Sequence, residues 1–483
     1  MFIGIDLGTS EVKTLLLDEQ HRILATHGVP LTVQRPQLLW SEQTPAAWWA
    51  AADQALQALA ASQPEAMAQV KAIGLSGQMH GAVLLDGDDE VLRPAILWND
   101  GRSAAQCAAL EAALPELHAI TGNLAMPGFT APKLLWVREH EPELFRRTRC
   151  VLLPKDWLRL MLTGDKVSEM SDAAGTLWLD VARRDWSDEV LAACGLARDH
   201  MPRLVEGSAV SGTLKAELAT RWGLPPGVVV AGGGGDNAAS AVGIGAVRPG
   251  QGFVSLGTSG VIFLTNDRFR PNPASAMHAF CHALPGAWHQ MSVMLSAASA
   301  LRWMRETLGL DSEAQLLELV AKLSPAERAQ APIFLPYLSG ERTPHNNPEA
   351  KGVLFGLTSL DDVGSIGYAV LEGISFGLKD GFASLGTAPG EVSRLSLVGG
   401  GARSALWAQL LASLLGVTLL THEGGEAGGA LGAARLAWLA AGGDLDTVCP
   451  MPPVKAVFEP DAAEAALLAP RYERFKGLYS KLF

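Results

Sequence analysis

The tetrapeptide Leu-Gly-Thr-Ser occurs twice, at residues 7–10 and again at 256–259, roughly half a chain apart. Each copy lies between two apolar runs, so each predicts a buried strand, a tight turn and a returning strand. The first unit covers residues 2–17 and the second covers residues 252–264. One matching tetrapeptide could arise by chance, but matching strands on both sides favour duplication of a whole domain.

The length of the chain agrees with a duplication. It has 483 residues, whereas a single hydrophobic core rarely grows past roughly 250–300 residues. Helical and strand-like segments alternate from about residue 97 to 247, which predicts an α/β architecture. Pro249 and Gly250 interrupt this pattern, so we expect a boundary within 245–250 and domains of residues 1–247 and 248–483.

Charge and cysteine usage exclude several classes of protein. The formal net charge is −12 and the basic residues are scattered, so nucleic acid is not expected as a partner. The apolar stretch 427–443 is interrupted by Arg435, so no membrane span is expected. The five cysteines are far apart and form no CxxC pair, which predicts neither a zinc site nor a disulfide framework. A cytoplasmic protein without a signal peptide is the expectation.

The two Gly-Thr-Ser turns could bind phosphate. A glycine lets the backbone curl closely around an anion, and successive N–H groups can then point inward. The two hydroxyls of each turn add neutral donors. Two such turns, one in each domain, could grip a polyphosphate across an interdomain cleft; two ordinary hairpins would look the same in sequence. The residues concerned are Gly8, Thr9 and Ser10 in the first turn and Gly257, Thr258 and Ser259 in the second.

Two aspartates, Asp6 and Asp236, are candidates for metal binding or catalysis. Asp6 ends the first predicted strand beside the first turn, where a carboxylate could organise Mg²⁺, although it could equally cap the turn. Asp236 follows a buried strand and the four glycines of 232–235, at the predicted start of a helix. An aspartate there can serve catalysis or can simply cap the helix. The four glycines indicate that something approaches the backbone closely.

Three further stretches carry candidate binding residues. Residues 399–401 are glycines between a predicted strand and a helix at 405–415, and could receive an adenosine. His80 follows a strand at 70–75 and could contact a ligand or be a satisfied buried histidine. Residues 98–102, Trp-Asn-Asp-Gly-Arg, mix side chains common in sugar sites, though a surface turn would look similar. Asp86-Gly87 predicts a hairpin between strands at 82–85 and 91–97.

One apparent motif is misleading, and other motifs are absent. Residues 373–377 read G-x-S-x-G, the pattern of a hydrolase nucleophile, but they lie in a segment with helical apolar spacing, 366–385. We interpret this match as a coincidence. The sequence contains no G-x-x-x-x-G-K-[ST] loop and no pair of H-R-D and D-F-G motifs. A protein of this kind would therefore bind ATP through another phosphate-binding architecture.

With these residues set out, the chain resembles the FGGY carbohydrate kinases of the actin-like superfamily over essentially its whole length. Residues 128–140 match the first signature of that family, and residues 352–357 with 369–372 match the second. Ser365 departs from the acidic, amide or histidine side chain usual in the second signature. Residues 77–81, 98–102, 234–237 and 335–344 are most similar to family members that phosphorylate D-xylulose. Glu11 also departs from the pattern, because the first phosphate turn usually has a small residue there.

The resemblance implies a fold, an activity and a set of site residues. It implies two actin-like (ribonuclease H-like) α/β domains around a cleft, and transfer of the γ-phosphoryl group of MgATP to O5 of D-xylulose. Asp236 is the implied general base, and Asp6 is the implied ligand that organises Mg²⁺. The implied sugar contacts are Met79, His80, Trp98, Asp100, Arg102, Asp236 and Asn237. The implied ATP contacts are Gly8, Thr9, Ser10, Lys13, Gly257, Thr258, Ser259, Gly400, Gly401 and Ser404.

Two alternatives remain at the level of sequence. The fold accepts many substrates through loop variation, so the acceptor could be another ketose, a polyol or a sugar acid. A chaperone or scaffold of the actin-like ATPase kind is the alternative from another class, although such proteins lack the Asp236-Asn237 pair and the 98–102 loop. A small-molecule sugar as partner and a homodimer are what the resemblance implies.

Overall fold

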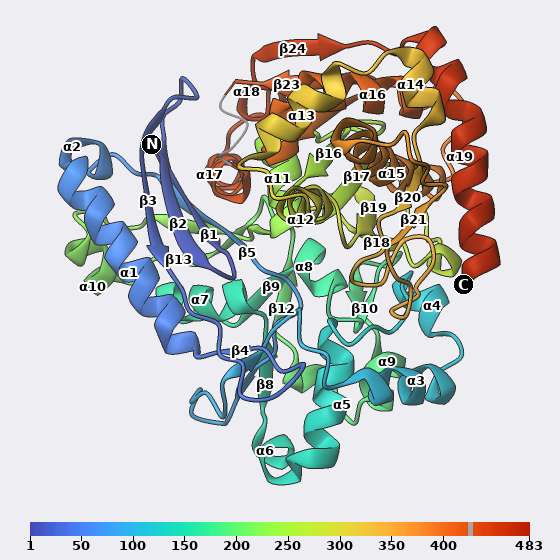
Figure 1. Ribbon diagram of the computed structural model, residues 1–483. Coiled ribbons are helices and arrows are strands. Elements are labelled where there is room, and N and C mark those ends of the chain that lie inside the picture. The colour runs from blue at the N-terminus through green and yellow to red at the C-terminus, as the bar shows by residue number, and fades with distance from the viewer. Residues whose placement is uncertain (424–427) are drawn as a thin grey trace.

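The computed structural model describes residues 1–423 and 428–483, and contains one seven-stranded mixed sheet in each half of the chain (Figure 1). The first sheet is made of β1 (Phe2–Leu7), β2 (Glu11–Leu17), β3 (Ile23–Pro30), β5 (Ala72–Gly77), β13 (Val210–Thr213), β14 (Val229–Ala231) and β15 (Gly234–Gly235). The second is made of β16 (Gly252–Leu256), β17 (Gly260–Asn266), β18 (His278–Cys281), β19 (Trp288–Met294), β22 (Arg394–Val398), β23 (Thr418–His422) and β24 (Val454–Phe458).

The two sheets have the same topology. In the first, β1 pairs antiparallel with β2 and parallel with β5, in the order β3-β2-β1-β5-β14. In the second, β16 pairs antiparallel with β17 and parallel with β22, in the order β19-β17-β16-β22-β23. This repeated order confirms the duplication, and it is the ribonuclease H-like, actin-like arrangement that the sequence predicted. The two Leu-Gly-Thr-Ser turns join equivalent strand pairs.

Both faces of the first sheet are covered, which explains why β1 is apolar almost throughout. Phe2, Ile3, Ile5 and Leu7 are buried, as expected for a strand with helices on both sides. The helices α1 (Pro45–Ser62) and α7 (Pro154–Thr163) pack on one side of the sheet. The helices α11 (Asp236–Gly243) and α17 (Gly428–Ala440) pack together, and α17 lies against β1 and β5.

Glycines allow α17 to lie directly on the first sheet. A Cβ added at Gly4 of β1 would lie 1.9 Å from the carbonyl oxygen of Ala430, and one at Gly74 of β5 would lie 1.8 Å from that of Ala433. A Cβ at Gly432 would lie 1.7 Å from the oxygen of Ala239 in α11. Any side chain at these three positions would push the helix away. A helix from the second half of the sequence therefore completes the core of the first half.

The second sheet is covered by α15 (Val363–Ala383) and α16 (Ala405–Leu415), and the C-terminal α19 (Ala462–Leu482) packs on both of these helices. The G-x-S-x-G segment lies inside α15, as expected. Its serine, Ser375, is fully buried, donates to the oxygen of Leu371 at 2.8 Å and accepts from Trp407 Nε1 at 3.0 Å. The motif is therefore part of the core and is not a nucleophile. Helix α16 covers the predicted residues 405–415 and is ended by Gly416, which has a left-handed conformation.

The predicted hairpin at Asp86-Gly87 is confirmed, with shorter strands than expected. Antiparallel bridges join Leu85 to Val91 and Ala82 to Ile96, and the N–H of Leu92 donates to the oxygen of Leu84 at 2.9 Å. Each edge also has a distant partner, because β6 (Val83–Leu85) pairs with β8 (Cys150–Leu152) and β7 (Ala95–Ile96) pairs with β4 (Glu42–Gln43). The local turn signal predicted the hairpin but not these long-range partners.

Smaller elements surround the two sheets. Those of the first half are α2 (Pro64–Met67), α3 (Ala104–Ala113), α4 (Leu117–Thr121), α5 (Thr130–His140), α6 (Pro142–Arg147), β9 (Val167–Glu169), α8 (Met170–Ala174), β10 (Leu179–Asp180), β11 (Asp185–Trp186), α9 (Asp188–Ala193), β12 (Arg203–Val205) and α10 (Ala216–Arg221). Those of the second half are α12 (Ala298–Thr307), α13 (Glu313–Ala321), α14 (Pro325–Gln330), β20 (Ile333–Leu335), β21 (Val353–Phe355) and α18 (Leu445–Val448).

The structure also bears on membrane-spanning helices and on the cysteines. Within the described residues, no helix combines the length and the apolar character needed to cross a membrane. All five cysteines are buried and carry free thiols.

Candidate functional site

The first sheet brings the sequence-predicted residues of the first half to one edge. The strands β1, β5 and β15 run parallel, with Asp6 and Gly234 both paired to Ser76, and Gly235 paired to Gly77. In open α/β sheets, ligands bind outside the carboxyl ends of the parallel strands. Asp6, the Met79-His80 segment and Asp236 all follow or end such strands, so they share this edge.

Asp236 is the first residue of α11 and is half-buried. Its Oδ1 accepts hydrogen bonds from the backbone N–H of Asn237 at 2.7 Å and from the Asn237 side-chain amide at 2.9 Å. These two bonds fix the orientation of the carboxyl group and leave Oδ2 for a ligand. Burial, with a further contribution from the negative charge of Asp6, raises the pKa of Asp236 to about 6. A carboxyl group with this pKa is suited to accept a proton near neutral pH.

Asp6 offers an unused carboxylate oxygen at the same edge. Its Oδ1 is buried, and its one nearby donor is the Ser76 hydroxyl, which is not in standard hydrogen-bond geometry among the described residues. Burial raises the pKa of Asp6, because the charged form is poorly solvated there. A cation would relieve this cost, so the geometry suits a metal ligand better than the alternative, a turn-capping aspartate. A Cβ at Gly429 would lie 2.9 Å from Asp6 Cγ, so α17 begins against this carboxyl group.

Met79 lies against the loop that carries Asp236, and both Met79 and His80 lie against Gly175. A Cβ at Gly235 would lie 2.8 Å from Met79 Sδ, and one at Gly175 would lie 2.8 Å from both His80 Nδ1 and Met79 Cε. His80 has a positive φ of 68°, a rare conformation for a residue with a side chain. Its Nδ1 lies 2.6 Å from the carbonyl oxygen of Gly175, so Nδ1 carries the proton. Burial lowers the pKa of His80 to about 3, which leaves a neutral ring whose Nε2 is an acceptor.

The unusual backbone of His80 is held by a buried lysine. Lys133 of α5 donates to the carbonyl oxygen of His80 at 2.8 Å and to that of Gly128 at 2.7 Å. Thr130 Oγ1 donates to the same oxygen of His80 at 3.1 Å. Burial lowers the pKa of Lys133 to about 7, since it is fully buried and its closest contacts are neutral carbonyls. Lys133 therefore acts on the site by positioning His80.

Replacing Lys133 by methionine is expected to raise KM for the acceptor by about tenfold, with a smaller change in kcat. The methionine keeps most of the volume but removes both hydrogen bonds, each worth about 1.5–3 kcal/mol when the donor is charged. Loss of ground-state binding appears mainly in KM. Steady-state kinetics measure both constants. Lys379→Met is the matched control, because Lys379 also donates to a carbonyl, that of Leu414 at 2.8 Å, but in the second half of the chain. Equal effects of the two variants would contradict this role.

The side chains of the 98–102 loop point in two directions, some toward the site and some toward the protein interior. Trp98 is exposed at the site and donates from Nε1 to Thr9 Oγ1 of the first turn at 3.0 Å. The side chains of Asp100 and Arg102 are instead buried against each other, 2.6 Å apart, and Arg102 also pairs with Glu42 at 2.8 Å. Arg102 stacks on the ring of Trp40 at 3.6 Å. The geometry therefore presents Trp98 to a ligand and gives Asp100 and Arg102 contacts within the protein.

The first turn is tied to its surroundings by side chains. Gly8 N–H donates to the oxygen of Glu11 at 3.0 Å, which closes the turn, and Thr9 Oγ1 donates to Gln78 at 3.2 Å. Ser10 at the tip is exposed. Lys13 and Glu11 form an ion pair at 3.4 Å, both side chains being more than a third exposed. The charge of Glu11, a departure from the family pattern, is thus offset by Lys13.

The second turn lines a cavity of about 520 Å³. Gly257 and Thr258 form part of its wall, and Ser259 O closes the turn by accepting from Gly257 N–H at 3.1 Å. The rest of the wall is made of Leu256, Ala298, Leu301, Arg302, Glu313, Ala314, Leu317, Gly400, Gly401, Arg403, Ser404 and Trp407. Ser404 also caps α16, because its Oγ accepts from Trp407 N–H at 3.2 Å. The size and mostly apolar lining suit a nucleoside.

A second cavity, of about 360 Å³, lies next to this pocket and is lined by residues of both halves of the chain. Its lining includes Asn237 and Ser240 of α11 on one side and Gly399, Gly400 and Arg403 on the other. Gly400 and Arg403 line both cavities. A ligand that fills the larger cavity could therefore extend along this wall to the residue next to Asp236.

No sequence motif predicted several of the residues that line the larger cavity. Leu301, Arg302, Glu313 and Leu317 come from α12 and α13, which carry no motif. Gln78, by contrast, was signalled by its place in the Gly-Gln-Met-His-Gly stretch, and it links the first turn to β5. Distant helices meet the glycine turns only through the tertiary fold.

Two protein-family models match this chain and show which class of protein it is. The N-terminal domain model of the FGGY family of carbohydrate kinases matches residues 1–243, and the C-terminal domain model matches residues 252–441. The chain belongs to the FGGY family of carbohydrate kinases. This membership makes the protein an enzyme and favours the kinase over the chaperone or scaffold alternative.

Individual relatives are similar over the full length of this FGGY kinase. The xylulose kinase of Escherichia coli K12 is 54% identical over 485 residues, which cover 100% of this chain and 99% of that protein. The xylulose kinase of Klebsiella pneumoniae is 53% identical with the same coverage. Among solved structures, a protein from Brucella ovis described as a xyloylose kinase has a TM-score of 0.96 at 50% identity, covering 100% of this chain and 99% of that one. A Plasmodium falciparum glycerol kinase, at 20% identity and a TM-score of 0.91 over 100% and 98% of the two chains, shares the fold.

Proposed function

We propose that this FGGY kinase transfers the γ-phosphoryl group of MgATP to the 5-hydroxyl group of D-xylulose. Relatives named xylulose kinases, 53–54% identical over the whole chain, support the acceptor. The observation that carries the proposal is the placement of Asp236. The residue before it, Gly235, lies against Met79, and the residue after it, Asn237, lines a cavity together with Gly400.

In the proposed reaction, Asp236 is the general base. Its free oxygen accepts the proton of the sugar O5–H as O5 attacks the γ-phosphorus of ATP. The O5–P bond forms while the bond from the γ-phosphorus to the bridging oxygen of ADP breaks. The two Asn237 hydrogen bonds hold the carboxyl group in one orientation for this step. Phosphoryl transfer depends mainly on positioning and charge neutralisation, so one well-oriented carboxylate is sufficient base.

Asp6 is the proposed residue that organises Mg²⁺. Its buried Oδ1, which has no hydrogen bond of standard geometry among the described residues, fits a hard cation that prefers oxygen ligands. Bound Mg²⁺ would neutralise charge on the transferring phosphate groups. The two turns are proposed to contact the phosphates, through residues 8–10 with Lys13 and through residues 257–259. Gly400, Gly401 and Ser404 are proposed to contact the adenosine.

The sugar is proposed to lie between Met79, His80, Trp98, Asp236 and Asn237. Neutral His80 would accept from a sugar hydroxyl through Nε2, and the exposed ring of Trp98 would cover an apolar sugar face. A direct contact of Asp100 and Arg102 with the sugar stays a prediction, and their buried ion pair lies in the same loop as Trp98. The homodimer and the cytoplasmic location stay predictions.

A panel of acceptors tests the proposal. ADP release is measured with D-xylulose, D-ribulose, L-ribulose, D-fructose, glycerol and D-gluconate, each with and without Mg²⁺. We expect kcat/KM for D-xylulose to exceed the next best acceptor by about 100-fold, because a site built to bind specific hydroxyls rejects analogues that misplace them. Product analysis should place the phosphate on O5. A preference for a polyol or a sugar acid would overturn the acceptor and would leave the kinase assignment intact.

A further inference from the structure

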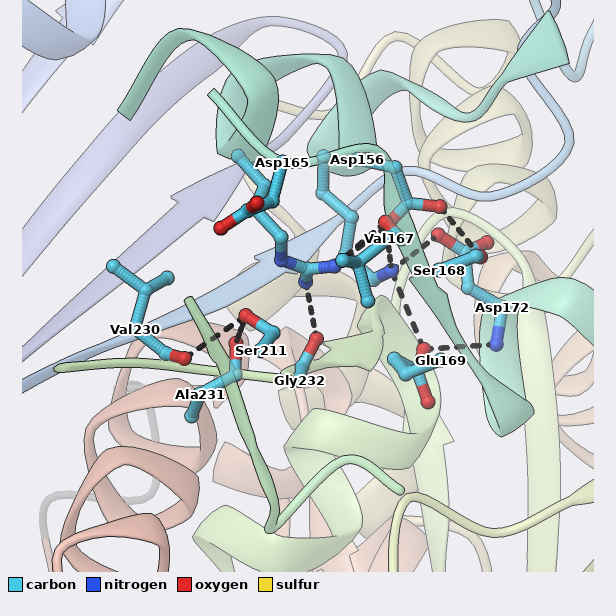
Figure 2. A network of polar contacts seen from close by, with 12 residues as sticks. Asp156, Asp165, Val167, Ser168, Glu169, Asp172, Ser211, Val230, Ala231 and Gly232 are labelled. Carbon is cyan, nitrogen blue, oxygen red and sulfur yellow. Dashed lines mark hydrogen bonds and ion pairs between the residues drawn. The ribbon is translucent and has the colours of Figure 1, made fainter. Parts of the chain in front are cut away.

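A cluster of five charged side chains is buried beneath the glycine loop that precedes Asp236. Lys155, Asp156 and Arg159 of α7 meet Glu169 and Asp172, and all five side chains are 0% exposed. Lys155 Nζ lies 2.7 Å from Asp156, 3.1 Å from Asp172 and 3.4 Å from Glu169. Figure 2 shows Asp156, Ser168, Glu169 and Asp172 gathered close to Gly232. None of these five residues is among the proposed ligand contacts.

The cluster is balanced in charge. It holds two cations and three carboxyl groups, and burial raises the pKa of Asp172 well above its usual value. A protonated Asp172 leaves two positive and two negative charges, a neutral set that can stay buried. The cost of removing such charges from water is high, so the position of every member is closely constrained. We call these five residues the buried support.

Two hydrogen bonds connect this support to the glycine loop. Arg159 donates from its guanidinium to the carbonyl oxygen of Gly232, at the start of the loop. Ser171 Oγ accepts from the backbone N–H of Gly235 at 3.0 Å, at its end. The Ser171 hydroxyl in turn donates to Glu169 at 2.9 Å, and Glu169 pairs with Lys155. Both ends of the loop are therefore held by the same buried cluster.

The loop depends on such backbone contacts because its residues have no side chains. A Cβ at Gly232 would lie 2.2 Å from the oxygen of Glu206, and one at Gly233 would lie 2.2 Å from the oxygen of Leu75. The chain is threaded through a space that admits only bare backbone. The N–H of Gly235 is one peptide unit from Asp236, so a shift at Gly235 moves the carboxyl group directly.

We propose that Ser171 is a positioning residue for Asp236, and that it couples the Gly235 backbone through Glu169 to the buried charge cluster. The inference rests on the proposed function, in which Asp236 is the general base. Ser171 touches neither acceptor nor nucleotide; it acts by fixing where the carboxylate meets the attacking hydroxyl. Misplacement of a reacting group by about 1 Å can cost about 100-fold in rate.

The test is Ser171→Ala in the full-length enzyme, with kcat and both KM values measured for MgATP and D-xylulose. We expect kcat to fall by about 10- to 100-fold, with KM for MgATP within about twofold of wild type. Ser211→Ala is the matched control. Ser211 is also buried and donates to the oxygens of Val230 and Ala231 in the strand before the loop, at 2.9 and 3.1 Å, but has no contact with Gly235. It should leave kcat within about threefold of wild type.

A double-mutant cycle separates positioning from general support. In an Asp236→Ala background, Ser171→Ala should cause almost no further loss of kcat, because Ser171 acts through Asp236. Independent, multiplying losses, or equal losses for the alanine variants at 171 and 211, would overturn the proposal. If the alanine variant does not fold, Ser171→Cys replaces it, since sulfur is a poorer acceptor of similar volume. A wild-type enzyme inactive on D-xylulose would refute the proposed function instead.

Discussion

Replacing Asp236 by alanine is expected to lower kcat by about 10²- to 10⁴-fold, the usual contribution of a general base. The variant keeps the proposed sugar contacts of Met79 and His80, so KM for the acceptor should change much less. Steady-state kinetics of ADP release on the purified variant measure this loss. Turnover within about threefold of wild type would reject Asp236 as the base.

The Asp236→Asn variant tests whether the loss of kcat comes from the missing base and not from a disturbed structure. Asparagine can still accept from the N–H of Asn237 but cannot take a proton. The pKa of Asp236 is raised to about 6 by burial and by Asp6, so the folded protein binds this proton more tightly than the unfolded chain. Stability is therefore lost as pH rises from about 4 to about 6. Removing the charge should leave Tm at pH 7.5 unchanged or higher.

The same pKa sets the pH dependence of the wild-type enzyme. The base must be ionised, so kcat/KM, which reports the free enzyme, should decline as pH falls through about 6. The residual activity of the asparagine variant should lack this acidic limb. An acidic limb that persists in the variant would assign the titration to another group.

The sequence predicted the local parts of the site well. A strand followed by a glycine-rich turn has few alternative structures. The two Gly-Thr-Ser turns and the position of Asp236 at the start of α11 could therefore be predicted from the sequence. The extent of α16, from a capping Ser404 to Gly416, follows from the same local rules. The repeat of the first unit in the second predicted the equivalent sheet topologies.

Structural features that depend on residues far apart in the chain could not be predicted from the sequence. The packing of α17 on β1 and β5 requires glycines at 4 and 74, whose meaning appears only when the helix is in place. Asp100 and Arg102 look like sugar ligands in sequence, yet Glu42 and Trp40 are close enough to engage Arg102. The support of Asp236 by Ser171 spans 64 positions along the chain between Ser171 and Gly235. No sequence period or local motif encodes such contacts.

Replacing Arg471 by methionine is expected to destabilise the fold more than any other single change considered for the second half of the chain. Arg471 of α19 is 7% exposed and Glu372 of α15 is 0% exposed. They form a bidentate pair at 2.6 and 2.7 Å, and Arg471 also donates to the oxygens of Ala329, Ala331 and Pro332. Methionine would leave a buried carboxylate unpaired, at a cost of about 3–5 kcal/mol. Thermal melting should show a Tm lower by about 10 °C, given about 2–4 °C per kcal/mol.

Two further variants identify the buried charge as the cause. Lys476→Met, on the same helix, breaks an exposed pair with Glu473 at 2.8 Å and should lower Tm by less than about 3 °C. The double variant Arg471→Met with Glu372→Leu removes both charges, and should recover more than half of the lost Tm because an apolar pair can replace a buried ion pair. If the double variant melted lower than Arg471→Met alone, the loss would come from packing and from the three freed carbonyl groups. In that case Glu372 would contribute to α19 docking through its shape, and its charge would be secondary.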